Sequence, residues 1–470
     1  MPSTSAPLVS VCVPTRNRAE KLRSALASAL AEPVDDLEIV VFDDASEDDT
    51  REVVRALDDR RIRYRRHRRR VGIARNRNAC LEVARGRYLA WLDDDDAYLP
   101  GGLLRQVGVL EREPDIALAH GAFEVVDGEG RPQPPWDRPF DEDTVEPGER
   151  AFSELLLSNY IGATTVVVRA TAQGAAGPYA TDLGDRGEDW DAWLRIALQG
   201  DLAYSASPVA TYRCHPGGAT HGRAGSLAWL RSEARVASRV LRAGGFTPAE
   251  GCELARRARA ALGIKAVTVA TDALARGRAR AAARAVRWAG RATPASRAHL
   301  LAAAGAAVDR DEHAFHVETG RALRAMVDPI SDSRFARTVL HGLAATEAWA
   351  AERTLVARRI RRIVPADARV VAADKWDPSL LREAGRSGGH FPDLALHPRG
   401  YPADDGDAIG HLADLQARGA DYLVFPSAGF WWLDHYSGFA RHLATRHDRV
   451  WADEVCVIYR LVAGPRETPA

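Results

Sequence analysis

Residues 71–96 read VGIARNRNACLEVARGRYLAWLDDDD, and this stretch decides the fold of the amino-terminal part of the chain. Ile73–Arg85 has helical periodicity and is followed by Gly86, the residue type that most often ends a helix. Arg87–Leu92 is a short apolar run, which predicts a buried strand leading directly into four aspartates. In sheets built from alternating helices and strands, ligands bind beyond the carboxyl ends of the strands.

The residues before this stretch repeat the same alternation. Leu8–Pro14 and Leu37–Phe42 are apolar and β-branched, so each predicts a buried strand, and Arg61–Arg65 reads as a third strand. Asn17 and Ser46 are predicted to cap the two helices that follow the first and second strands. The fold class is therefore α/β, with a largely parallel sheet.

The rest of the chain changes character twice. Thr164–Arg169, Glu188–Leu198 and Leu202–Tyr212 predict a strand, a helix and a strand. From about residue 227 the sequence is rich in Ala and Arg with helical periodicity, and Pro365 precedes a last group of strand-like runs. The sequence thus predicts an α/β domain over residues 1–226, a helical region and connector over 227–364, and a small α/β domain over 365–470.

Composition excludes several classes of protein. The 470 residues carry 64 Lys+Arg and 64 Asp+Glu, so net charge gives no reason to expect nucleic acid as a partner. The five cysteines form no Cys-x-x-Cys pair, and no apolar run reaches the ~18 residues of a membrane span, which favours a cytoplasmic protein with at most a peripheral membrane contact. Arg60–Arg70 is the one strong basic block; a solvated edge strand is the favoured interpretation, ahead of a surface for an anionic acceptor.

Four motifs in order resemble the amino-terminal half of family 2 glycosyltransferases. They are VSVCVPTRNRAEKLRSAL at 9–26, EIVVFDDASEDDT at 38–50, RIRY at 61–64 and the stretch quoted first. The resemblance covers about residues 8–225. It implies the GT-A fold and an inverting, metal-dependent transfer of a sugar from a nucleotide-sugar donor, with UDP as the expected nucleotide.

The acidic run after the fourth strand carries the expected metal site. Carboxylates at i and i+2 beyond a strand end can share a hard divalent cation, which neutralises a departing diphosphate. The resemblance places Mn²⁺ or Mg²⁺ on Asp95, with Asp93 and Asp94 near the ribose and the inner metal shell; the register stays open because four aspartates are consecutive. It also implies that His215, in Tyr-Arg-Cys-His, approaches the diphosphate or the metal.

The nucleoside is expected at the ends of the first two strands. The resemblance implies that Asp44 accepts a hydrogen bond from the uracil imide and that Pro14, Thr15 and Asn17 line the same pocket. Arg75, which follows Gly72, is expected either to approach the nucleotide or to order the loop before it.

The general base is expected at the start of a helix. Gly187-Glu188-Asp189-Trp190 matches a family segment in which an Asp deprotonates the acceptor hydroxyl. Asp189 is the predicted base and Glu188 the alternative, while Asp191 is expected to face away. A helix N-terminus would favour the ionised carboxylate.

Two other functions were weighed against this one. A catalytically silent saccharide-binding or scaffold protein could keep the fold, and a nucleotidyltransferase also combines an α/β sheet with metal-binding aspartates. The expected partners are a nucleotide sugar and a saccharide, lipid-linked or small-molecule acceptor, with no nucleic acid and with homo-oligomer formation open.

Overall fold

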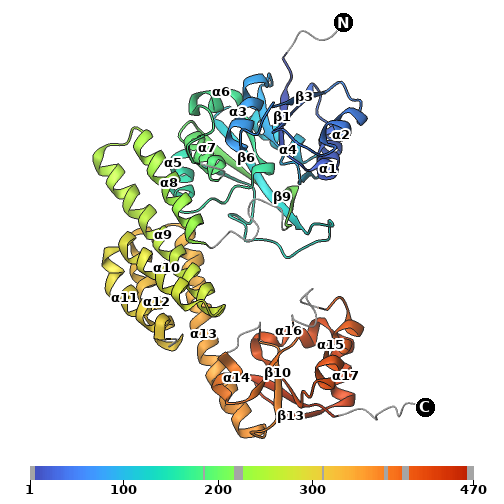
Figure 1. The fold of residues 1–470 in the computed structure, drawn as a ribbon, viewed down its shortest axis with the longest axis vertical. Helices are drawn as coiled ribbons and strands as arrows, with labels where there is room; N and C mark the ends of the chain where they lie inside the picture. Colours follow the sequence, from blue (N-terminus) through green and yellow to red (C-terminus); the bar gives the residue numbers. More distant parts are fainter. Residues whose placement is uncertain are drawn as a thin grey trace, which may run out of the picture. The chain divides into compact units, whose positions relative to one another are not determined.

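The computed structural model describes residues 6–183, 186–215, 226–309, 312–374, 379–393 and 402–462. The chain divides into two compact units, Met1–Leu340 and His341–Ala470 (Figure 1). The three-part division predicted from the sequence stays a prediction. None of the helices in the described ranges is long and apolar enough to cross a membrane.

The first unit is built on one large mixed sheet. Its strand order is β3-β2-β1-β4-β8-β6-β9-β5, and β7 pairs with β9. β3, β2, β1 and β4 run parallel to one another, whereas β8 is antiparallel to both β4 and β6. The strands are β1 (Val9–Thr15), β2 (Leu37–Asp43), β3 (Ile62–Arg66), β4 (Tyr88–Trp91), β5 (Ala97–Tyr98), β6 (Ile116–Val126), β7 (Thr144–Glu146), β8 (Val167–Arg169) and β9 (Asp201–Arg213).

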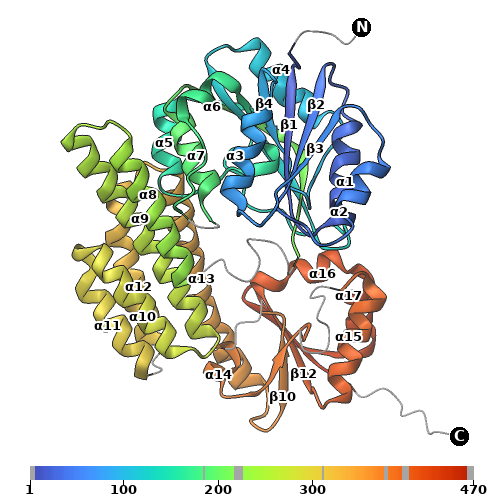
Figure 2. The same cartoon turned by 45° about the horizontal axis from the view of Figure 1, so that its top comes forward.

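Helices cover both faces of this sheet, as the alternation of strand and helix predicts. Val11 and Val13 of β1 face α1, α2 and α4, whereas Cys12 between them belongs to the core formed with α3, α5, α6 and α7. Figure 2 shows α1 and α2 on one side of β1–β4 and α3 on the other. The helices are α1 (Ala19–Leu30), α2 (Thr50–Ala56), α3 (Ile73–Val83), α4 (Gly102–Arg112), α5 (Gly148–Leu155), α6 (Ala170–Ala176) and α7 (Glu188–Ala197).

A helical region completes the first unit. Its core is made of small and medium apolar side chains, so its helices can approach closely, and Leu157 from the segment after α5 belongs to the same cluster. Arg334, at the start of the last helix, donates from Nη1 to Glu146 Oε1 at 2.7 Å and from its backbone N–H to Glu154. The helices are α8 (Leu227–Ala243), α9 (Pro248–Ala275), α10 (Ala279–Ala292), α11 (Arg297–Asp309), α12 (Glu312–Val327) and α13 (Arg334–Ile363), which runs on into the second unit.

The second unit is a small α/β fold with its own sheet, in the order β11-β10-β12-β14-β13. β11, β10 and β12 are parallel, and β14 and β13 continue the sheet antiparallel. Trp432 is buried in its core, in the same cluster as Phe391 and Phe439. The elements are β10 (Arg369–Ala372), α14 (Ser379–Ala384), β11 (Ser387–His390), α15 (Asp405–Ala417), β12 (Tyr422–Pro426), α16 (Trp431–His435), α17 (Ser437–Arg446), β13 (Asp448–Ala452) and β14 (Cys456–Arg460).

Two predicted helix caps are wrong. Neither α1 nor α2 has a side-chain cap hydrogen bond. Instead, Ser46 Oγ accepts from the backbone N–H of Asn17 at 2.9 Å, and Asn17 Oδ1 accepts from Glu47 N–H at 2.8 Å. The two residues therefore tie the loops after β1 and β2 to each other, because each loop offers the other a backbone donor that would otherwise be unpaired. The predicted strand 164–169 is also shorter, because a 3₁₀ turn occupies Ala163–Thr165.

Candidate active site

Asp95 and His215 meet beyond the ends of β4 and β9, which are separated in the sheet by β8 and β6. Asp95 follows β4 and His215 follows β9, and His215 Nε2 lies 2.8 Å from Asp95 Oδ2. Arg18, in the loop between β1 and α1, places Nη1 2.7 Å from the same oxygen. The structure therefore joins the residue predicted to bind the metal to the histidine predicted to assist it.

Asp94 and Asp96 make hydrogen bonds to other side chains of the protein. Asp94 accepts from Thr15 Oγ1 and from Arg18 Nη1, both at 2.7 Å. Burial raises the pKa of Asp94 to about 6, and the neighbouring Asp95 adds to this effect while Arg18 opposes it. Asp96 accepts from Thr164 Oγ1 at 2.7 Å, and burial raises its pKa as well. These two carboxylates hold the acidic loop in place, whereas Asp93 and Asp95 are only partly buried.

Arg77 joins the acidic loop to the predicted general base. This arginine of α3 is buried, and its Nη2 lies 2.9 Å from Asp93 Oδ1 while its Nε lies 3.5 Å from Glu188 Oε1. Its guanidinium also lies over Trp91, 5.0 Å from the ring centroid. Burial alone would lower the pKa of Arg77, but the nearby carboxylates raise it, so the side chain stays charged. The end of β4 and the start of α7 therefore face the same buried cation.

Glu188 and Asp189 differ sharply in environment. Glu188 is buried, and burial followed by the charge of Asp189 raises its pKa to about 7, while Arg77 opposes this rise. Asp189 is half-buried, and its Oδ1 accepts from the backbone N–H of Trp190 at 2.7 Å. Asp191 is fully buried in ion pairs, as its predicted orientation away from the substrate requires. Asp189 is thus the carboxylate of this turn that a substrate hydroxyl can reach.

The predicted nucleoside residues lie together at the ends of β1 and β2. Asp44 donates its N–H to Thr15 O at 2.9 Å, and its carboxylate accepts from the N–H groups of Val71 and Gly72 at 2.6 and 3.0 Å. Asp44 therefore orders the loop before α3, and its oxygens keep lone pairs for a further donor. Pro14 is buried within β1, and Asn17 is exposed beside this pair of loops.

The structure separates Arg75 from the cluster. Arg75 is exposed on α3, whereas Arg77, two residues later, points into the site. Sequence reasoning missed Arg77, although a signal existed: it lies three residues after Ala74 and three before Cys80, on the apolar face of the helix. Arg18 was missed too, because its role depends on a loop that local patterns do not place.

Few side chains of the described residues are placed to act as metal ligands. Within the ranges that the structure describes, no group of three or more His, Cys, Asp or Glu side chains could hold a metal ion by itself. Asp95 and His215 nevertheless offer one carboxylate and one imidazole next to Asp93. Mg²⁺ and similar cations often use only one or two carboxylates and take their remaining ligands from substrate phosphates and water. The donor set therefore fits a cation that binds together with a diphosphate. The loop 217–223, expected to close over the donor, lies outside the described residues.

Comparisons with known proteins find glycosyltransferases that are similar to the amino-terminal part of this chain. Residues 10–158 match the family described as "Glycosyl transferase family 2". The Escherichia coli protein "UDP-Glc:alpha-D-GlcNAc-diphosphoundecaprenol beta-1,3-glucosyltransferase WfaP" is 28% identical over 214 residues, which are 45% of this chain and 78% of that protein. "Putative teichuronic acid biosynthesis glycosyltransferase TuaG" of Bacillus subtilis is 28% identical over 210 residues, 44% of this chain and 79% of that protein.

Two further matches show the limits of the similarity. An uncharacterized glycosyltransferase of Rickettsia felis is 29% identical over 214 residues, 44% of this chain, but the chain spans only 34% of that relative. The crystal structure of S. aureus TarS 1–349 in complex with UDP-GlcNAc aligns with a TM-score of 0.49 and 17% identity, over 67% of this chain and 91% of that one.

Proposed function

We propose that this chain, which belongs to glycosyl transferase family 2 through its amino-terminal part, transfers a sugar from a nucleotide-sugar donor to an acceptor hydroxyl with inversion. The observation that supports this most is the pair of contacts made by Arg77, 2.9 Å to Asp93 and 3.5 Å to Glu188. A donor held at Asp93–Asp95 and an acceptor held beside Glu188–Asp189 would meet at this point. That geometry suits a single in-line displacement, in which the acceptor attacks opposite the leaving group.

The donor side is assigned to the ends of β1, β2 and β4. Asp44 would accept from the base, and Asp95 with His215 would hold Mn²⁺ or Mg²⁺. The cation, when bound, supplies positive charge to the departing diphosphate. Arg18 now occupies Asp95 Oδ2 at 2.7 Å, so it must release this oxygen when a cation binds. Its guanidinium could then pair with phosphate while it keeps its contact with Asp94.

Asp189 is assigned as the general base. A base must reach the acceptor hydroxyl, and Asp189 is half-buried at the first turn of α7 whereas Glu188 is buried against Arg77. Glu188 stays the alternative, because a carboxyl with a pKa of about 7 suits proton transfer at neutral pH.

The names of relatives suggest the substrates. UDP-glucose and a sugar linked to a lipid diphosphate appear in the name of the E. coli relative. By analogy, we propose that the donor of this chain is a UDP-sugar and that its acceptor is a saccharide on an anionic or lipid carrier.

The test is a screen of UDP-sugars, read as released UDP, with and without Mn²⁺. Asp189→Asn should keep UDP affinity near wild type and lower turnover by about 10²–10⁴-fold, because it removes the base but not the donor site. Glu149→Gln, an exposed first-turn acid of α5, is the matched control and should retain turnover. Full turnover in Asp189→Asn together with a loss of turnover in Glu188→Gln would identify Glu188 as the general base. Full turnover in both variants would refute the proposed mechanism.

A further inference from the structure

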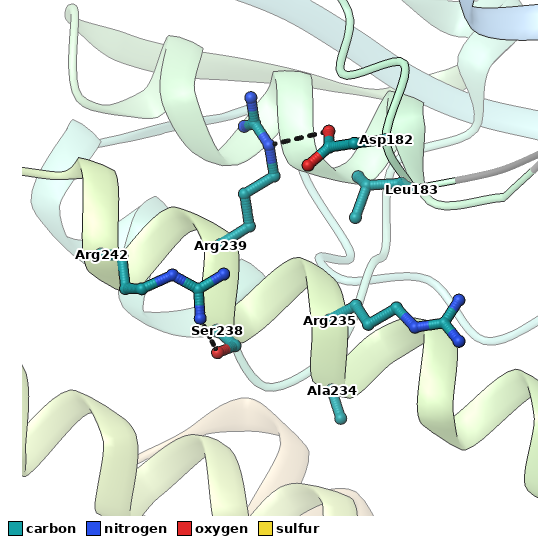
Figure 3. Close-up of a pocket in the computed structure, with 7 residues that line it drawn as sticks. All are labelled: Asp182, Leu183, Ala234, Arg235, Ser238, Arg239 and Arg242. Carbon is teal, nitrogen blue, oxygen red and sulfur yellow. Dashed lines mark hydrogen bonds and ion pairs between the residues drawn. The ribbon is translucent and has the colours of Figure 1, made fainter.

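A pocket lies between α8 and the loop that precedes α7 (Figure 3). Its volume is about 310 Å³, at the lower end of the ~300–1,000 Å³ typical of small-ligand sites. Figure 3 shows the Arg239 guanidinium reaching Asp182, with Arg242 bent toward Ser238. The lining residues are Asp182, Leu183, Ala234, Arg235, Ser238, Arg239 and Arg242.

The lining is rich in guanidinium groups. Arg235, Arg239 and Arg242 are spaced by four and three residues, which places them on one face of α8. Among the lining residues that the structure describes, the acidic one is Asp182, whose side chain is 72% exposed. Ser238 Oγ, which accepts from Arg242 Nη1 at 2.6 Å, adds a hydroxyl to the same face. Among the described lining residues, guanidinium groups therefore outnumber carboxylates, and the Arg235 side chain extends away from those of Arg239 and Arg242 (Figure 3).

Arg239 is held in place by an ion pair with a buried carboxylate. Arg239 Nη1 lies 2.8 Å from Asp191 Oδ1, and Asp191 is fully buried in the first turn of α7. Asp191 Oδ2 also pairs with Arg195 at 2.7 Å, so its charge is compensated on two sides. An arginine fixed in this way loses little conformational entropy when it binds a ligand.

The same helix carries the predicted catalytic turn. Ser232 Oγ of α8 donates to the carbonyl of Arg186 at 3.4 Å. Gly187 has φ +76°, and a Cβ at this position would lie 2.7 Å from Val236 Cγ2, so only glycine allows the chain to lie this close to α8. Glu188 and Asp189 follow directly. The pocket residues of α8 and the start of α7 thus belong to one packed contact between the two helices.

We infer that this pocket binds the phosphate or diphosphate group of an anionic acceptor. Arginine recognises phosphate through paired N–H donors, and the net positive lining selects an anion. The donor diphosphate is assigned to Asp95 and His215, at the ends of β4 and β9. Arg239 of the pocket pairs with Asp191, two residues after Asp189 in the first turn of α7, so we assign this second anion site to the other substrate. The claim that the anion belongs to the acceptor rests on the proposed function. The claim that the pocket binds an anion rests on the pocket alone.

The test uses the full chain with Arg235→Ser, Arg242→Ser and the double variant. Both side chains are exposed, so the variants should fold, whereas Arg239 is left intact because it compensates Asp191. Arg231→Ser is the matched control, since Arg231 is an exposed arginine of the same helix that does not line the pocket. The probes are inorganic pyrophosphate in EDTA, an alkyl diphosphate ester of the accepted sugar, and the methyl glycoside of that sugar.

Calorimetry with pyrophosphate should show roughly tenfold weaker binding for each arginine removed, since a charge-assisted hydrogen bond is worth about one factor of ten in affinity. KM for the diphosphate acceptor should rise by a similar factor, while KM for the methyl glycoside and for the UDP-sugar stays unchanged. Arg231→Ser should match wild type in each assay.

The outcomes separate the two claims. Unchanged pyrophosphate affinity in the double variant overturns the anion site. Weakened pyrophosphate binding with an unchanged KM for the diphosphate acceptor shows a site for free phosphate and overturns the acceptor role. A wild-type chain that transfers no sugar refutes the proposed function and the acceptor role, while the pyrophosphate titration still decides whether the pocket binds an anion.

Discussion

Replacing Glu188 with Gln should make the stability of the first unit less dependent on pH. Burial and the charge of Asp189 raise the pKa of Glu188 from 4.5 to about 7. Each pKa unit corresponds to about 1.4 kcal/mol, so the difference between folded and unfolded chain amounts to about 3 kcal/mol. Glu188 is almost completely enclosed, so solvent screening takes little from this figure.

The sign of the effect follows from the direction of the shift. Below pH 4.5 the carboxyl is protonated in both states, and its contribution to stability is fully present. As the pH rises from 4.5 to 7, the unfolded chain gains a favourable ionised carboxylate while the folded chain holds the proton, so wild type loses stability. Gln cannot ionise. The stability of Glu188→Gln relative to wild type should therefore increase by about 3 kcal/mol between pH 4.5 and 7.5.

The assay is urea unfolding at pH 5, 6, 7 and 8 in metal-free buffer. Hydrogen exchange of α7 peptides is the readout, because it reports on the first unit alone. Glu82→Gln, an exposed glutamate of α3, controls for the removal of one charge. A difference between Glu188→Gln and wild type that stays flat within ~0.5 kcal/mol over this range would refute the argument. A difference that falls with pH would show that Arg77 outweighs burial and holds the pKa low.

Three further outcomes are expected. Asp95→Ala should abolish the Mn²⁺-dependent part of UDP binding measured by calorimetry without unfolding the chain, and unchanged affinity would remove Asp95 from the metal site. Arg334→Met should lower the unfolding free energy by about 3 kcal/mol, because it strands Glu146 without its 2.7 Å partner; Arg150→Met, whose exposed side chain lies 3.7 Å from the same Glu146, should cost less than about 1 kcal/mol in parallel urea titrations. A chain ending at Leu340 should still bind UDP with Mn²⁺ but lose transfer to the natural acceptor or change its oligomeric state in light scattering, and a folded truncation without UDP binding would contradict this.

Local patterns were sufficient for most elements. Apolar runs located β1 and β2 to within one or two residues, and helical periodicity located α7 to within one residue. These signals work because strand and helix formation depend on which neighbouring side chains share a face. The Thr247–Glu250 capping box at the start of α9 forms as such a motif should, since both residues are exposed and no distant partner competes for them.

The two predicted helix caps are wrong because the side chains of these residues find other hydrogen-bond partners. Asn17 and Ser46 have the residue types of helix caps, but their loops are adjacent in space. Ser46 Oγ accepts from the backbone N–H of Asn17, 29 residues away, and Asn17 Oδ1 accepts from that of Glu47, 30 residues away. Sequence spacing carries no information about such a partner. A cap is predicted reliably only where nothing else in the fold can take its hydrogen bond.

The sequence by itself determined the α/β fold of the amino-terminal part and the positions of its acidic residues, because strand ends and aspartates are local features. Only the tertiary structure decided which of those residues act together. Arg18, Arg77 and Arg239 each find their carboxylates 16 to 111 residues away. The physical reason is that a charge can be buried only beside its counter-charge, and the packing of β4, α3, α7 and α8 brings those opposite charges together.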